Sequence, residues 1–103
     1  MIQFLLMSAL VAIVASHPDF WPCARFVNYA PPRPFLDREV KLRVYAYYKQ
    51  ALAGDCTDHE PENVMERWKK DAWCKLRGMT RDVAEERYVK LVDEIEPNWR
   101  NLL

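Results

Sequence analysis

The chain has 103 residues, half of them hydrophobic, which suits one small domain with a single core. Its 15 basic and 15 acidic residues cancel, so the chain lacks the positive excess typical of a general nucleic-acid-binding protein. Glycine is scarce, and no Asn-Gly or Asp-Gly pair marks a β-hairpin. The composition therefore predicts an all-helical domain with no nucleic acid among its partners.

Residues 2–15 (IQFLLMSALVAIVA) form an uncharged, largely apolar run that is too short to span a bilayer comfortably. Two interpretations fit this run. It can be the apolar region of a secretory signal, with Val14 and Ser16 as small residues before a cleavage site, although no Lys or Arg lies near the start of the chain. It can equally be a helical extension that packs on the domain or contacts a membrane. The sequence thus divides into an apolar leader, residues 1–16, and a domain, residues 17–103.

Four helices are predicted in the domain from apolar spacing, capping residues and glycine or proline stops. Their boundaries are Asp19 to about Tyr29, Asp37 to about Ala53, about Asn63 to Leu76, and Thr80 to Pro97. Their apolar stripes, expected to form the core, are Phe20, Cys23, Ala24 and Val27; Val40, Val44, Tyr47 and Ala51; Met65, Trp68, Ala72 and Leu76; and Ala84, Tyr88, Leu91 and Ile95. Trp99 follows in an apolar tail whose packing the sequence leaves open.

The three cysteines, Cys23, Cys56 and Cys74, are an odd number and include no CxxC pair. They predict neither a disulfide framework nor a structural zinc site, but small apolar side chains in a reducing compartment. His17 and His59 lie far apart in proline-flanked loops, where surface or capping roles are expected. The sequence predicts no metal site and no cofactor.

The second predicted helix carries two different faces and is the expected centre of the fold. One face is the apolar stripe given above. The other presents two phenols and an ammonium group at i, i+3 and i+4 spacing, from Tyr45, Tyr48 and Lys49, with Lys41 close to them. This face suits a ligand that combines an anionic part with a flat or apolar part. As isolated features, half-buried core tyrosines beside a solvated lysine would give the same pattern.

The sequence lacks the motifs GxxxxGK[ST], GxGxxG, HExxH and GxSxG, which mark common nucleotide sites and hydrolases. No spacing places a nucleophile beside a base. The acidic residues Asp93, Glu94 and Glu96 are most simply a solvated helix face. These observations favour a binding protein over an enzyme.

Two sequence blocks resemble the signature of acyl-CoA-binding proteins. Residues 45–55 read YxxYKQAxxGD, and residues 69–80 read KxDAWxxLxGMT, followed by AxxxYV at residues 84–89. The resemblance covers roughly residues 19–96. It implies an all-α, four-helix up-down-down-up bundle of the acyl-CoA-binding protein type, with an extra apolar N-terminal segment in this chain.

The resemblance also implies a function, which is one-to-one binding of long-chain fatty acyl-CoA esters by a monomeric carrier and buffer in lipid metabolism. Its partners are then fatty acyl-CoA and, transiently, the enzymes that use it. The implied location is the cytoplasm, with the secretory pathway or a membrane surface as the alternative if residues 1–16 act as a signal or anchor. The residues that match the family's nucleotide contacts are Tyr45, Lys49, Lys69 and Tyr88. Secondary candidates near the acyl chain or the pantetheine arm are Tyr48, Lys41, Leu42 and Ala24.

Departures from the family pattern keep other functions open. Lys70 stands where the family usually has Trp, directly before the DAW triplet, and Trp68 faces another side of the helix. Lys70 can therefore share or take over the phosphate role of Lys69. The main alternative is a helical interaction or membrane-associated module with weakened or lost acyl-CoA binding. A small enzyme acting on the thioester is a third alternative, disfavoured because no nucleophile–base pair is found.

Overall fold

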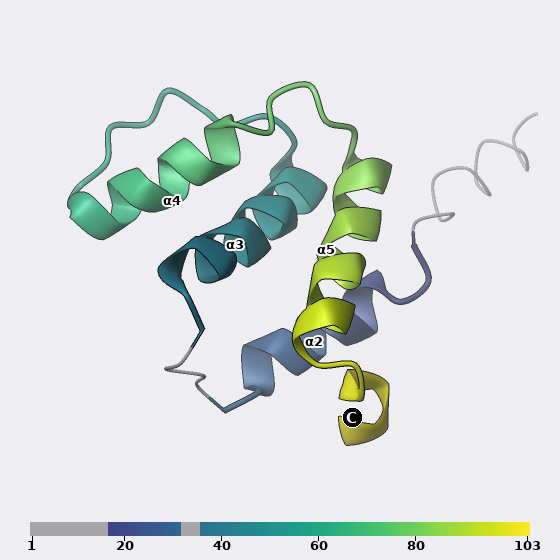
Figure 1. The fold of residues 1–103 in the computed structure, drawn as a ribbon. Coiled ribbons are helices and arrows are strands. Elements are labelled where there is room, and N and C mark those ends of the chain that lie inside the picture. Colours follow the sequence, from purple (N-terminus) through teal and green to yellow (C-terminus); the bar gives the residue numbers. More distant parts are fainter. Residues whose placement is uncertain (1–16, 32–35) are drawn as a thin grey trace, which may run out of the picture.

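The computed structural model describes residues 17–31 and 36–103, and in these residues the chain forms four α-helices and a final 3-10 turn (Figure 1). They are α2 (Phe20–Tyr29), α3 (Arg38–Ala53), α4 (Val64–Cys74), α5 (Arg81–Ile95) and η1 (Trp99–Leu102). The predicted all-α organisation is confirmed for this part of the chain, and the predicted helix boundaries lie within a few residues of those observed. The predicted apolar leader, residues 1–16, lies outside the described residues.

Helix α3 is central, because it packs against both α4 and α5 (Figure 1). Helix α2 packs against α5 and η1, so α2, α3, α5 and η1 enclose the hydrophobic core. The stripes predicted for α2 and α5 enter this core largely as expected. The buried members of the core cluster are Phe20, Cys23, Ala24, Ala51, Ala84, Tyr88, Val89, Val92 and Trp99.

Three aromatic rings from three helices meet in the core. Tyr88 of α5 lies 5.3 Å from Phe20 of α2 and 5.9 Å from Tyr48 of α3 between ring centroids. Such separations are typical of favourable aromatic pairs. Tyr88 is 1% exposed, so its ring is a core element.

The faces predicted for α3 and α4 are partly wrong. The buried residues of α3 are Ala46, Gln50 and Ala51, whereas the predicted Val44 and Tyr47 are half-buried at the edge of the core. No residue of α4 is buried, and Met65 of its predicted stripe is 49% exposed. The reason is the one-sided position of α4, which rests on α3 outside the core.

A disulfide joins Cys56, in the loop after α3, to Cys74, the last residue of α4, with Cα atoms 5.2 Å apart. This contradicts the prediction of three free thiols in a reducing compartment. An odd number of cysteines does not predict which two lie close together. In the fold, the end of α4 returns to the start of the loop that joins α3 to α4, which brings Cys74 to Cys56. Cys23 is the free cysteine, and burial raises the pKa of its thiol to about 12.

The fully buried side chain of Gln50 connects the two loops that flank α4. Its Nε2 donates to Asp55 Oδ1 and to the Met79 carbonyl, both at 2.9 Å. Asp55 Oδ1 also accepts the N–H of Gly78 at 2.9 Å, and this bond holds the pKa of the Asp55 carboxyl below its ordinary value. Gly54 and Gly78 have φ of 78° and 88°, a region that disfavours other residues, so both loops need glycine at their turn.

The predicted caps give a mixed result. Thr80 Oγ1 accepts the N–H of Val83 at 3.3 Å, as expected for an N-cap. Asp19 lies at the N-cap position of α2 but makes no capping hydrogen bond. Its carboxylate instead pairs with Arg100 of η1 at 2.8 Å, and Arg100 also binds Asp93 at 2.8 Å.

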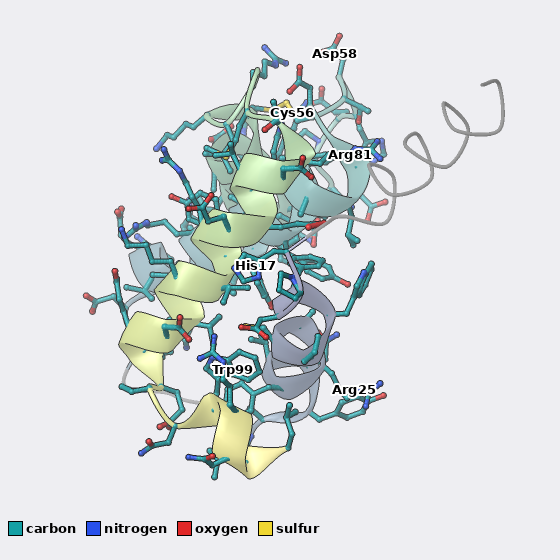
Figure 2. The ribbon with its side chains drawn as sticks, turned by 90° about the vertical axis from the view of Figure 1, so that its right-hand side faces the viewer. His17, Arg25, Cys56, Asp58, Arg81 and Trp99 are labelled. Carbon is teal, nitrogen blue, oxygen red and sulfur yellow. A yellow bond between two sulfur atoms is a disulfide. The ribbon has the colours of Figure 1, made fainter. Side chains whose placement is uncertain are left out.

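Trp99 makes the C-terminal turn part of the core. Its side chain is 1% exposed, lies between η1 and α2 (Figure 2), and donates from Nε1 to Asp93 Oδ1 at 2.7 Å. The tail that the sequence left open is therefore packed at Trp99, while Leu102 and Leu103 stay exposed.

Replacing both bridged cysteines, as Cys56→Ser with Cys74→Ser, should lower the free energy of unfolding by about 3 kcal/mol, because the bridge closes a loop with a sequence separation of 18. Urea unfolding with and without reductant measures this loss. The double variant is its own control, since reductant should not change its midpoint. A wild-type midpoint that is equally insensitive to reductant would show that the bridge adds no stability.

Trp99→Ala should destabilise the protein by about 3–5 kcal/mol, because it empties a buried site and leaves Asp93 without its indole donor. Leu102→Ala is the matched control in the same turn, since Leu102 is 60% exposed and should change stability little. Thermal unfolding of both variants checks the difference. Equal melting temperatures would contradict a core role for the C-terminal turn.

Candidate functional site

A groove of about 390 Å³ lies between α3, α4 and the loop that joins them, and is called the α3–α4 groove below. On α4 its residues recur at i, i+4 and i+7, which places them on one face of that helix. The groove is lined by Tyr45 and Lys49 of α3, by Glu66, Lys70 and Trp73 of α4, and by Thr57, His59, Pro61 and Glu62 of the loop.

Two lysines lie over aromatic rings at this groove. Lys49 Nζ is 4.9 Å from the ring centroid of Trp73, and Lys69 Nζ is 5.3 Å from that of Tyr45. Both distances fall within the range of cation–π attraction. Trp73 is held in place by its Nε1–H, which donates to the Gly54 carbonyl at 2.8 Å. The groove therefore combines flat rings with ammonium groups at fixed positions.

The charges of the groove are only partly neutralised. Lys69 pairs with Glu66 at 3.4 Å, while Lys70 Nζ donates to the backbone carbonyl of His59 at 2.6 Å. Lys70 thus ties the loop to α4 and keeps its positive charge in the groove. Burial raises the pKa of the Tyr45 phenol, so its hydroxyl stays protonated at neutral pH and can donate a hydrogen bond.

The predicted site residues fall in separate places. Tyr45 and Lys49 line the α3–α4 groove, and Lys69 lies over the Tyr45 ring. Leu42 lines a second groove, of about 410 Å³, on the opposite face of α4. Lys41 lines an apolar pocket of about 270 Å³ formed by α2, α3 and α5.

The remaining three predicted residues lie in or against the core. Tyr88 and Ala24 are 1% and 3% exposed, and Tyr48 is half-buried against Phe20 and Tyr88. Burial raises the pKa of the Tyr88 phenol. Of the eight predicted residues, the structure thus groups three at the α3–α4 groove. The three residues in or against the core have a packing role instead.

Trp73 lines the groove but is not among the eight site residues predicted from the sequence. Its indole nitrogen does hold the loop, but its ring also faces Lys49. The signal that could have found it is its spacing, since Trp73 lies three residues after Lys70 and so shares a helix face with it.

Within residues 17–31 and 36–103, no cluster of three or more His, Cys, Asp or Glu side chains could hold a metal ion. None of the helices described there is long and apolar enough to cross a membrane.

Comparisons with known proteins agree with this architecture. A family model described as "Acyl CoA binding protein" matches residues 17–92. The acyl-CoA-binding protein of Saccharomyces cerevisiae is 39% identical over 74 residues, which cover 70% of this chain and 83% of the yeast protein. The solution structure of an acyl CoA binding protein from Babesia bovis superposes with a TM-score of 0.69 at 39% identity, covering 80% of this chain and 94% of that one.

The chain belongs to the acyl-CoA-binding protein family. The resemblance seen in the two sequence blocks and the predicted four-helix bundle of the acyl-CoA-binding protein type are confirmed. Similarity extends to part of a larger protein, human enoyl-CoA delta isomerase 2, at 35% identity over 89 residues, which is 84% of this chain but 22% of that protein. Acyl-CoA-binding protein sequences therefore also occur within a protein named as an isomerase.

Trp73→Phe should lower the free energy of unfolding by about 1 kcal/mol, because it keeps a ring in the groove but removes the hydrogen bond to the Gly54 carbonyl. Trp21→Phe is the matched control, since Trp21 is 58% exposed. Urea unfolding compares the two variants. Equal effects would mean that the Trp73 indole does not anchor the loop.

Proposed function

We propose that this protein binds one long-chain fatty acyl-CoA ester and holds the nucleotide part in the α3–α4 groove. The observation that carries the proposal is the convergence of aromatic rings and ammonium groups, from Tyr45, Lys49, Lys69, Lys70 and Trp73, in a chain of the acyl-CoA-binding protein family. The yeast relative is named an acyl-CoA-binding protein.

Each part of the ligand matches a chemical feature of the groove. Coenzyme A carries a phosphorylated adenosine and a pyrophosphate, which need a flat surface and positive charge. The Tyr45 ring and the protonated Tyr45 hydroxyl offer stacking and a donor. Lys49, Lys69 and Lys70 offer point charges, and each charge-assisted hydrogen bond is worth about 1.5–3 kcal/mol.

The acyl chain is proposed to run from Tyr45 toward the start of α3. Leu42 and Lys41 lie three and four residues before Tyr45, one helical turn away. Each alkyl CH₂ removed from water contributes about 0.8 kcal/mol. Long-chain esters should therefore bind much more tightly than short ones, and free coenzyme A should bind weakly.

Tyr48, Tyr88 and Ala24 are proposed to support the site through packing. Tyr48 lies on the same helix as Tyr45 and Lys49, and Tyr88 lies against its ring, 5.9 Å away between centroids. Because Trp99 completes the same core, residues 17–103 are proposed to form one acyl-CoA-binding domain.

The proposed role is that of a monomeric carrier and buffer without catalytic activity, which passes acyl-CoA to the enzymes that use it. No nucleic acid is expected as a partner. Residues 2–15 are the proposed segment for any contact with a membrane. The alternative is a helical interaction module with weakened ligand binding, which Lys70 at the family's tryptophan position favours.

For the location, the resemblance implies the cytoplasm. The Cys56–Cys74 disulfide favours the alternative, an oxidising compartment of the secretory pathway.

Lys49→Met should weaken palmitoyl-CoA binding about ten- to a hundred-fold, because it removes one charge-assisted contact while keeping a side chain of similar length. Isothermal titration calorimetry with palmitoyl-CoA, coenzyme A and palmitate measures this loss. The carrier hypothesis predicts tight binding of the first ligand alone.

Lys90→Met is the matched control, because Lys90 is an exposed lysine of α5 that lines a different surface hollow. It should bind palmitoyl-CoA like the wild type. Failure of the folded wild-type protein to bind palmitoyl-CoA would favour the interaction module. Thioester cleavage by pure protein, abolished by a point substitution, would favour an enzyme.

A further inference from the structure

His17 is fixed at three polar atoms where α2 begins beside α5 (Figure 2). Its backbone N–H donates to Glu85 Oε2 at 2.9 Å, across 68 residues of sequence. Its Nδ1 accepts the N–H of Asp19 at 3.1 Å, and its carbonyl accepts the N–H of Phe20 at 3.1 Å. The nitrogen of His17 therefore has a defined position against the middle of the bundle.

The carboxylate that accepts this hydrogen bond, from Glu85, is largely buried. Glu85 is 7% exposed, and a buried carboxylate is costly unless a positive charge or several hydrogen bonds compensate it. Among the described residues its hydrogen bond comes from the His17 nitrogen, and it has no ion pair there. The neighbouring carboxylates Asp19 and Asp93 both have Arg100 as a partner. Within residues 17–31 and 36–103, Glu85 thus has no cationic partner, in contrast to Asp19 and Asp93.

A free α-amino group on His17 would supply that cation. An α-ammonium at the same position keeps the hydrogen bond to Glu85 and adds a full positive charge. The sequence directly before His17 suits its release, because the apolar run of residues 2–15 contains Val14 and is followed by Ser16, two small residues at alternate positions before the bond.

The Cys56–Cys74 disulfide is an independent observation that points to the same route. Disulfides form and persist in the secretory pathway and outside the cell, and are rare in the cytosol. A chain that enters this pathway meets the peptidases that remove apolar leaders.

We propose that a processing peptidase of the secretory pathway cleaves the chain between Ser16 and His17, and that the new α-ammonium of His17 forms an ion pair with the buried Glu85. In the cleavage, water breaks the C–N bond. Its oxygen goes to the Ser16 carbonyl carbon, which becomes a carboxylate, and the His17 nitrogen takes up protons to become the ammonium. This processing does not depend on the proposed ligand.

Expression of the full chain in a eukaryotic secretory host tests the cleavage site. Intact-mass analysis and N-terminal sequencing of the secreted product should give a chain that begins at His17. Ser16→Arg, which places a large charged residue before the bond, should reduce cleavage there at least several-fold. A secreted wild-type product that keeps its leader, or that begins at another residue, would overturn the proposal.

The ion pair is tested on the processed protein by the reactivity of its α-amino group. Glu85 should raise the pKa of this group above its ordinary value of about 8, so acetylation at pH 7 should be several-fold slower in the folded protein than in urea. Glu85→Gln should restore most of that rate, while Glu86→Gln, at an exposed neighbouring position, should not. If Glu85→Gln does not fold, the comparison between the folded and urea-unfolded wild type decides alone. Equal rates in both states would refute the ion pair.

Discussion

Both connections of α4 depend on the buried amide of Gln50. Its two hydrogen bonds hold Asp55 in the loop before α4 and the Met79 carbonyl in the loop after it. No residue of α4 is fully buried, and its half-buried Trp68, Ala72 and Trp73 are the apolar side chains that it can pack on α3. Three further directional links act on the same helix: the Cys56–Cys74 bridge, the Trp73–Gly54 hydrogen bond and the Lys70–His59 hydrogen bond. One wall of the proposed ligand groove is therefore set by polar and covalent geometry.

Helix α3 contributes to the hydrophobic core on one side and to the proposed ligand groove on another. The side that holds Ala51 enters the core with α2 and α5, and the side that holds Tyr45 and Lys49 faces the α3–α4 groove. Tyr48 lies between these sides and touches the core ring of Tyr88. Substitutions at Lys49 can thus change the groove without opening the core, whereas changes at Tyr48 act on the core.

The features predicted from sequence were those encoded within a few residues of chain. The Thr80 cap, the glycine turns and the helical spacing of α2 and α5 depend on neighbours, and they are found as expected. Long-range features were missed because several partners compete for one side chain. Asp19 had a local capping role available, yet Arg100 offers it a charged partner. The spacing of residues within one helix likewise could not show that Cys74, at the end of α4, lies beside Cys56 in the loop before α4.

In the candidate site, too, local features were predicted and long-range contacts were not. The signature blocks name Tyr45 and Lys49 on α3 and Lys69 on α4, and the packing of α4 on α3 brings Lys69 over the Tyr45 ring. Sequence could not show that Lys70 would reach the His59 carbonyl, since this contact depends on the path of an irregular loop. Tyr88 has two predicted roles, a core position from its helical stripe and a ligand contact from the resemblance, and its burial confirms the core position.

The ion pair between Arg100 and Asp19 joins positions that lie 81 residues apart in sequence. During synthesis α2 leaves the ribosome first, yet the surfaces that cover it, α5 and η1, are made last. The cover that α5 and η1 give to α2 is therefore complete only when nearly the whole chain has emerged, and the closure of so long a loop is slow compared with helix formation. The order of synthesis thus leaves part of the apolar face of α2 uncovered until the end, and η1 is the last element to cover it.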